Sequence, residues 1–267
     1  MLKTIIPSKD RAPQLDLLLR SIKRFVRNWQ DNETIILRRT TTDESSEAYA
    51  QLEREHPEFQ YHDEQAFRPD FQALALSGDA EWLQLVMDDD VYVKPFGLDD
   101  PEVLSLRDDP NVAAISLRMA PSMDYCYAEN AYTGAPWFRA DRCWLWMGLI
   151  GDWGYPHSVD ASIWRMEDVA TIIESGQYTM LHQLEPELRL AMRRPLCRCY
   201  AESRVLNVAN NSVQDSCPPN RHAGGDASSM TKRYLLGERI ELEPLCEQHP
   251  KSPHFEYEFT WSNGNGP

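Results

Sequence analysis

The chain has 267 residues, of which 42% are hydrophobic and 26% charged, so it can bury a sizeable core and is too apolar to be disordered over most of its length. Its formal net charge of -15 argues against nucleic acid as a partner, because phosphate backbones are bound by clustered lysine and arginine. No stretch approaches the roughly 18 apolar residues that span a bilayer, and no secretion signal opens the chain. We therefore expect a cytoplasmic protein that is not an integral membrane protein.

The first ninety residues alternate between short apolar runs and amphipathic stretches. Leu15, Leu18, Leu19 and Ile22 recur at helical spacing, which is the pattern of a helix that buries one face. Short apolar runs ending in Pro, Thr or Asp read instead as strands. The sequence thus predicts strands at 2–7, 33–43, 59–63 and 81–87, and helices at 12–26, 46–55 and 67–78.

This alternation predicts a mostly parallel sheet with helices on both faces, since parallel strands need crossover connections. In such sheets ligands bind outside the carboxyl ends of the strands. The loops that begin at Pro7, Thr40 and Asp88 all leave from that edge. We therefore expect these three polar segments to converge on one crevice.

The pattern becomes irregular after about residue 115. Five of the eight tryptophans fall between Trp137 and Trp164, which suggests a layer that shapes a substrate site. One more helix is predicted at 167–177, where two acidic residues suit a helix N-terminus, and one or two strands within 196–214.

Asp88, Asp89 and Asp90 directly follow the predicted strand at 81–87. Three adjacent anions repel one another, so the run must end in a loop where positive charge can approach. Water, a basic side chain or a metal ion could fill that role. Mg²⁺ or Mn²⁺ suits it, because these cations take oxygen ligands and are often held by one or two carboxylates together with substrate phosphates.

Two segments of the chain resemble nucleotide-sugar glycosyltransferases with the GT-A fold, particularly the family-two-like enzymes. "TIIPSKDRAPQLDLLLRSI" at 4–22 looks like their opening strand, nucleotide loop and first helix, and "VMDDDVYV" at 86–93 looks like their DxD motif. "RTTTDES" at 39–45 matches less closely, because many members carry a pair of acids followed by Gly and Ser there. The resemblance implies an α/β fold with a mostly parallel central sheet flanked by helices. It also implies one domain over 1–267, with a nucleotide-sugar-binding half at 1–120 and an irregular acceptor-binding half and tail at 121–267.

Carried over residue by residue, the resemblance assigns the donor side of the site. It implies that Asp88 and Asp89 contact the nucleotide, with Asp88 facing the ribose or donor sugar, and that Asp90, together with Asp88, binds a Mn²⁺ or Mg²⁺ ion bridging the diphosphate. A histidine late in the chain often completes such a metal site, and His222 matches by position. The implied contacts to the nucleoside are Pro7, Ser8, Lys9, Asp10, Asp43 and Arg68.

Candidates for the catalytic base and the acceptor site lie between 151 and 168. Asp160, in a polar break before an apolar run, is one candidate base; Glu167 and Asp168 are others, although capping of a helix explains that pair equally well. Trp153, flanked by two glycines, and His157 are candidate acceptor contacts, with packing as the alternative reading of both.

The resemblance, together with these residues, implies a metal-dependent glycosyltransferase that moves a sugar from a nucleoside-diphosphate donor, such as a UDP- or GDP-sugar, to a carbohydrate or other hydroxyl acceptor. A nucleotidyltransferase is one alternative, but "PSKDRAPQ" at 7–14 lacks the glycines of a phosphate-binding loop. A sugar-nucleotide-binding module without turnover is the other alternative.

Overall fold

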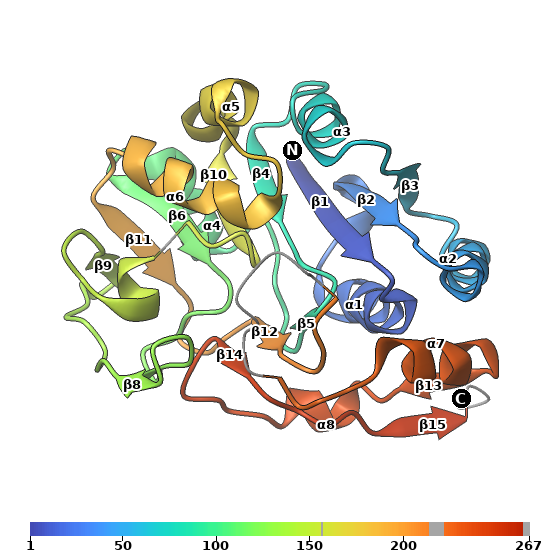
Figure 1. The fold of residues 1–267 in the computed structure, drawn as a ribbon. Coiled ribbons are helices and arrows are strands. Elements are labelled where there is room, and N and C mark those ends of the chain that lie inside the picture. Colours follow the sequence, from blue (N-terminus) through green and yellow to red (C-terminus); the bar gives the residue numbers. More distant parts are fainter. Residues whose placement is uncertain (156, 214–221, 264–267) are drawn as a thin grey trace.

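An eight-stranded sheet forms the centre of the computed structural model, which describes residues 1–155, 157–213 and 222–263 (Figure 1). Its strands follow the spatial order β3-β2-β1-β4-β10-β6-β11-β9. The bounds of these strands are β1 Leu2–Lys9, β2 Glu33–Arg39, β3 Gln60–Asp63, β4 Trp82–Leu85, β6 Val112–Ser116, β9 Cys143–Leu145, β10 Ser162–Arg165 and β11 Leu196–Cys199.

Six of the eight strands run in one direction. β1 is parallel to β2 and β4, β2 to β3, and β6 to β11, whereas β10 runs antiparallel to both β4 and β6, and β9 runs antiparallel to β11. The expected α/β fold with a mostly parallel central sheet is therefore confirmed. Residues on both sides of position 120 contribute strands to this one sheet.

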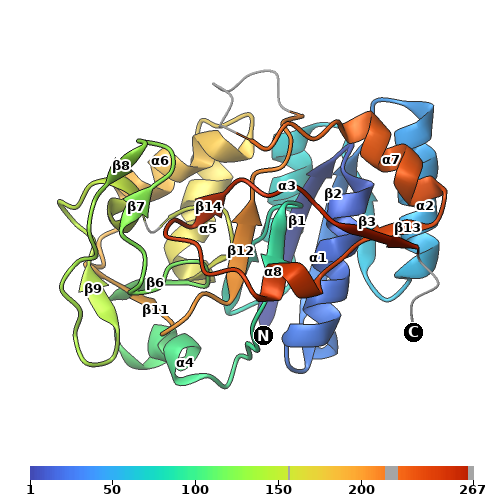
Figure 2. The same ribbon diagram turned by 90° about the horizontal axis from the view of Figure 1, so that it is seen from below.

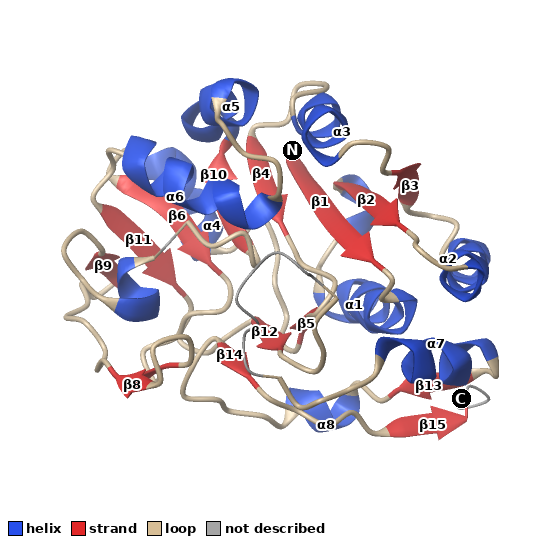
Figure 3. Cartoon of the chain, in the orientation of Figure 1, coloured by secondary structure: helices blue, strands red, loops and turns tan. Residues whose placement is uncertain are grey.

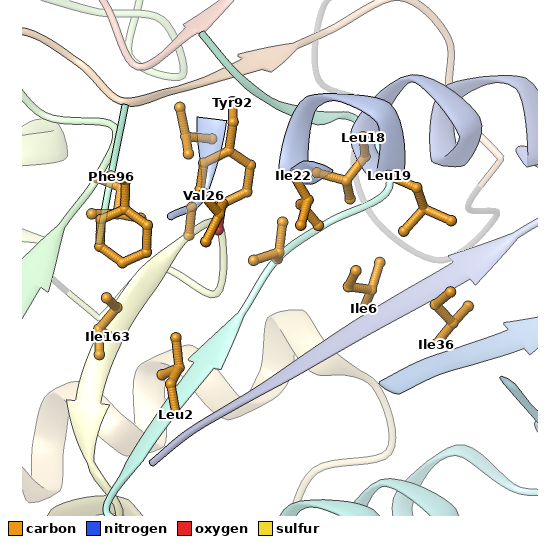
Figure 4. Close-up of a cluster of buried hydrophobic side chains, with 14 of the residues drawn as sticks. Leu2, Ile6, Leu18, Leu19, Ile22, Val26, Ile36, Tyr92, Phe96 and Ile163 are labelled. Carbon is orange, nitrogen blue, oxygen red and sulfur yellow. The ribbon is translucent and has the colours of Figure 1, made fainter. Parts of the chain in front are cut away.

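Helices cover both faces of the sheet (Figure 3). Residues of α1, α2 and α4 pack in one buried cluster, and residues of α3, α5 and α6 pack in another. Figure 4 shows Leu18, Leu19 and Ile22 of α1 facing Ile6 and Ile36 of β1 and β2. The helices are α1 Ala12–Phe25, α2 Asp43–Glu55, α3 Phe67–Ala75, α4 Pro101–Asp108, α5 Met166–Ser175 and α6 Leu181–Ala191.

The C-terminal part folds back over the first helices (Figure 2). α7 packs against α1 and α2, and a third buried cluster joins this segment to Leu17 and Val91. A small sheet of order β14-β12-β5 connects the acidic run to the end of the chain. The remaining elements are β5 Asp90–Tyr92, β7 Tyr125–Cys126, β8 Ala131–Tyr132, β12 Val205–Val208, α7 Ala227–Leu235, β13 Glu238–Ile240, α8 Glu243–Cys246, β14 His254–Phe255, β15 Trp261–Asn263 and the short 3-10 helices η1 Trp29–Asp31 and η2 Gly151–Gly154.

Pro7 does not end the first strand as the sequence suggests, because β1 continues to Lys9. The carbonyl of Ile5 accepts a hydrogen bond from the Val86 amide, so Ile5 and the residue two positions on, Pro7, both face the β4 side. β4 has already ended at Leu85. Because no β4 residue lies opposite Pro7, the missing N–H of this proline removes no hydrogen bond between β1 and β4.

No helix within the described ranges is both long and apolar enough to cross a membrane.

Candidate active site

A cavity of about 990 Å³ opens at the carboxyl ends of the parallel strands. Pro7, Ser8 and Lys9 at the end of β1, with Asp88 and Asp89 after β4, form part of its lining. Other lining residues come from 149–152, 158–160 and 179–189, from the segments that follow β6 and β12, and from the ends of β2 and β3. Two of the three predicted segments, those that follow β1 and β4, therefore share one crevice, whereas the loop that begins at Thr40 contributes no lining residue and only the preceding Arg39 reaches the cavity.

Arg11 lies between the first two carboxylates of the acidic run. Its Nη1 donates to Oδ1 of Asp88 at 3.0 Å and to Oδ2 of Asp89 at 3.1 Å. Oδ2 of Asp88 also accepts the hydroxyl of Ser8 at 2.9 Å and the backbone N–H of Lys9 at 3.3 Å. A basic side chain therefore supplies part of the positive charge that the run requires.

Asp90 is fully buried and does not line the cavity. Its Oδ2 accepts the backbone N–H of Met87 at 2.9 Å, and its Oδ1 accepts the side-chain amide of Asn207 at 3.0 Å. The same amide reaches Oδ1 of Asp89 at 2.9 Å. The position of Asp90 does not fit the predicted metal ligand, because the start of β5 turns its side chain into the protein. Asp89, whose side chain is 19% exposed, presents its carboxylate to the cavity instead.

Burial and the charge of neighbouring carboxylates affect the protonation of this run. Burial and the nearby Asp160 raise the pKa of Asp90 well above its usual range. Burial raises the pKa of Asp89 to about 6, although Arg11 opposes the shift. Burial is the largest cause of both shifts, and the charges of neighbouring carboxylates add to it.

Asp160 is held at the cavity by Arg118, which follows β6. Nη1 of Arg118 lies 3.1 Å from Oδ2 of Asp160, and its Nε donates to the Asp160 carbonyl at 2.9 Å. The hydroxyl of Ser158 donates to the same carboxylate at 2.9 Å. Burial disfavours the charged form of Asp160, but Arg118, His254 and the Ser158 hydroxyl together outweigh it, so the pKa of Asp160 is lowered.

His254 joins the two acidic groups from the far end of the chain. Its ring contacts Nη1 of Arg118 at 3.0 Å through Nε2 and Oδ1 of Asn207 at 2.7 Å through Nδ1. Burial and the charge of Arg118 lower the pKa of His254 to about 4, so the ring is neutral near pH 7. One polar network therefore runs from Asp160 to the acidic run.

Glu185 of α6 faces the cavity beside this network. Its Oε1 accepts the backbone N–H of Val159 at 2.8 Å, and its Oε2 accepts the hydroxyl of Tyr155 at 3.0 Å. Burial and the charge of Asp160 raise the pKa of Glu185 to about 7. A carboxylate with this pKa can accept and release a proton near neutral pH.

The direction of β10 places one of the three predicted base candidates at the cavity and the other two away from it. Ser162 at the start of this strand pairs with Leu85 at the end of β4, which brings the preceding Asp160 to the cavity. Arg165 at its other end pairs with Trp82 at the start of β4. Glu167 and Asp168 follow Arg165, so they lie at the opposite edge of the sheet, where both form ion pairs with Arg194. Their predicted catalytic role does not fit this position.

The two predicted acceptor contacts are packed inside the protein, outside the cavity lining. Trp153 is 3% exposed and meets Trp144 edge to face, with 5.1 Å between the ring centroids. His157 is fully buried with its ring against Trp146 at 5.0 Å. The packing alternative therefore describes both residues.

Three predicted nucleoside contacts also lie outside the lining of the cavity. Both carboxylate oxygens of Asp10 accept hydrogen bonds from Thr41, at 2.8 and 2.7 Å. Asp43 is exposed in the first turn of α2. The guanidinium of Arg68 lies 5.3 Å from the centre of the Tyr178 ring. The predicted metal ligand His222, in contrast, is an exposed residue in the lining.

Sequence reasoning missed Arg11, Arg118, Glu185 and His254. A signal existed for Glu185, because Leu181, Leu184 and Leu188 recur at the spacing of a buried helical face and place this acid on a helix. Arg118 and His254 meet 136 positions apart in the chain. No local pattern predicts such a contact.

No protein family model matches the chain, and no curated protein matches it in sequence. Similar solved structures include a mannosyltransferase from Pyrobaculum calidifontis in complex with GDP-Man and Mn²⁺ (14% identity, TM-score 0.44, 74% of this chain and 54% of that one). S. aureus TarS gives 12% identity and a TM-score of 0.47 over 74% and 34% of the two chains. Glucosyl-3-phosphoglycerate synthase from Mycobacterium tuberculosis, in complex with Mn²⁺, UDP-Glc and phosphoglyceric acid, gives 10% and 0.37 over 63% and 57%.

The chain thus spans 34% to 57% of the length of these three proteins. At such identities and TM-scores, the similarities do not decide the activity of this chain.

Proposed function

We propose that the chain is a glycosyltransferase that moves a sugar from a nucleoside diphosphate to a hydroxyl acceptor. The observation that carries this proposal is a single cavity whose lining includes Asp88 and Asp89 with Arg11, which we call the donor wall, and Glu185 with the loops beside it, which we call the acceptor wall. The reaction needs charge compensation for a departing diphosphate on one side of the sugar and a proton acceptor on the other. The two walls match these two needs.

Glu185 is the proposed base. The acceptor hydroxyl gives its proton to the Glu185 carboxylate, its oxygen bonds to the anomeric carbon, and the bond from that carbon to the phosphate oxygen breaks with its electron pair leaving on the diphosphate. The pKa of Glu185, about 7, leaves it ready to accept this proton near neutral pH. Asp160 is less suited, because the ion pair with Arg118 lowers its pKa. We assign Asp160 and Arg118 the role of fixing the wall beside Glu185.

The acidic run fits a divalent cation at Asp89. Each oxygen of that carboxylate accepts one protein donor and keeps a further lone pair, and the side chain reaches the cavity. Among the residues that the structure describes, no trio of carboxylate, thiol or imidazole ligands is assembled at the cavity. The donor set therefore suits Mn²⁺ or Mg²⁺ held by Asp89 and the substrate phosphates; Asp88 and His222 also line the cavity. Such an ion would neutralise charge that develops on the departing diphosphate.

The test combines binding with turnover. GDP and UDP, each with Mn²⁺, should raise the melting temperature, and the sugar nucleotide of the better ligand should be slowly hydrolysed. The variant Asp89→Asn should lose the Mn²⁺-dependent part of the stabilisation. If neither nucleotide binds, the proposal is wrong; if a nucleotide binds but no sugar is released or transferred to any acceptor, the chain is a binding module.

A further inference from the structure

An ion pair lines the cavity where β2 and β3 end. Nη1 of Arg39, the last residue of β2, lies 3.3 Å from Oε1 of Glu64, the residue after β3. Only 11% of the Glu64 side chain is exposed, against 56% for Arg39. Phe67, three residues further on, lines the same cavity at the start of α3.

The neighbouring ion pair shows that this placement is specific. One residue earlier on each strand, Arg38 pairs with Asp63 at 2.6 Å, yet neither residue lines the cavity, and the Asp63 side chain is 68% exposed. Successive side chains of a strand point to opposite faces, so only the second pair turns toward the ligand site. Glu64 thus presents a carboxylate on this part of the wall, while Asp43 is exposed elsewhere and Asp10 is engaged by Thr41.

We propose that Glu64 and Arg39 read the base of the donor nucleotide and select guanine. The inference rests on the proposed function, which places a nucleoside diphosphate in the cavity with its diphosphate at Asp89. The base then extends along the ends of β1, β2 and β3, toward Arg39, Glu64 and the ring of Phe67.

Hydrogen-bond chemistry favours guanine over the other bases. Guanine presents two adjacent donors, N1–H and the N2 amino group, which a carboxylate accepts as a pair, and beside them the acceptor O6, which an arginine can bind. Uracil presents one N–H between two carbonyl oxygens, and these oxygens repel a carboxylate. Adenine and cytosine each offer one amino group next to an acceptor nitrogen, with the same conflict.

The test compares GDP, inosine diphosphate and UDP, each with Mn²⁺, by isothermal titration calorimetry. Hypoxanthine lacks only the N2 amino group, so the wild-type protein should bind GDP about tenfold or more tightly than inosine diphosphate. Glu64→Gln and Glu64→Ala should remove most of this difference. Asp63→Asn changes the adjacent ion pair, which lies outside the cavity. This variant should retain the difference in affinity between GDP and inosine diphosphate.

Three results would overturn the inference: tighter binding of UDP than of GDP, equal binding of GDP and inosine diphosphate, or full discrimination in both Glu64 variants. Each of these leaves the proposed function standing, because a nucleoside diphosphate still binds. Failure of all three nucleotides to bind would instead overturn the proposed function together with this inference.

Discussion

The two walls of the cavity are built in different ways. The donor wall consists of residues at the ends of β1, β2 and β4, where the order of parallel strands places side chains next to one another. The acceptor wall consists of loops and one end of α6, fixed by side-chain contacts between distant parts of the chain, such as Arg118 with Ser158. Backbone topology therefore positions the first wall, whereas tertiary contacts position the second.

The walls also differ in how their carboxylates are neutralised. Asp88 and Asp89 share the fixed charge of Arg11, at 3.0 and 3.1 Å. Glu185 accepts hydrogen bonds from Tyr155 and Val159, which are both neutral donors. Burial raises the pKa of Asp89 to about 6 against the opposing charge of Arg11, whereas burial and the nearby charge of Asp160 raise the pKa of Glu185 to about 7. The donor wall is thus suited to binding and the acceptor wall to proton transfer.

The largest expected effect comes from removing the proton acceptor. Glu185→Gln keeps the shape of the side chain but cannot accept a proton, so kcat should fall about 10²- to 10⁴-fold while the Kd for the nucleotide is unchanged. Steady-state kinetics and calorimetry measure the two quantities. Glu187→Gln is the matched control, because Glu187 lies on the same helix, outside the cavity lining, and accepts the backbone N–H of Gln177. Normal turnover by Glu185→Gln would show that Glu185 is not the proton acceptor and that the acceptor wall does not carry out the proton transfer.

Two neighbouring carboxylates of the acidic run should differ in their effect on metal-dependent binding. Asp89→Asn should weaken Mn²⁺-dependent nucleotide binding about tenfold, because this side chain reaches the cavity. Asp90→Asn should lower the free energy of unfolding by about 1 to 3 kcal/mol, since Met87 and Asn207 both donate to this buried carboxylate and an amide cannot accept at both positions. Urea unfolding and calorimetry on both variants test this. If only the Asp90 variant lost metal-dependent binding, Asp90 and not Asp89 would be the metal ligand.

The pH dependence of stability should reveal Glu185 without a substrate. Its pKa is about 7 in the folded protein against 4.5 for an ordinary glutamate, so the folded state binds this proton more tightly than the unfolded state does. The resulting stability is present below pH 4.5 and is lost as the pH rises through about 7, by roughly 3 kcal/mol at most. Subtracting the unfolding free energy of Glu185→Gln at each pH isolates this contribution. A difference that stays constant from pH 4.5 to 7.5 would contradict the elevated pKa.

The sequence predicts the donor wall well because local patterns determine it. Apolar runs and helical spacing locate β1 to β4 with the first three helices, and parallel strand order then brings Ser8 to within 2.9 Å of Asp88. The errors of the sequence prediction on the donor wall concern the orientation of single side chains. Asp90 turns inward because β5 begins at that residue and pairs with β12, a contact that no pattern around position 90 reveals.

The acceptor wall could not be predicted in the same way. The aromatic residues of 137–164 suggested a substrate surface, but Trp153 packs against Trp144, whose indole N–H donates to the Trp153 carbonyl at 3.0 Å. An aromatic side chain in a sequence does not reveal whether it lines a cavity or fills the core. The sequence also did not reveal the direction of β10. That direction brings Asp160 to the cavity and places the two acids that follow Arg165 at the opposite edge of the sheet.

The smallest expected effect is a change in the pKa of Glu185 that leaves its function as a base intact. In Tyr155→Phe, Glu185 loses the hydroxyl that donates to its Oε2 at 3.0 Å, a bond that favours the ionised carboxylate. The pH profile of kcat should therefore move toward alkaline pH by about half a unit, with the plateau rate unchanged. Tyr61→Phe, which removes a hydroxyl bonded to the His56 carbonyl, should leave the profile in place. A lower plateau without a shift would mean that Tyr155 acts on the substrate and does not tune Glu185.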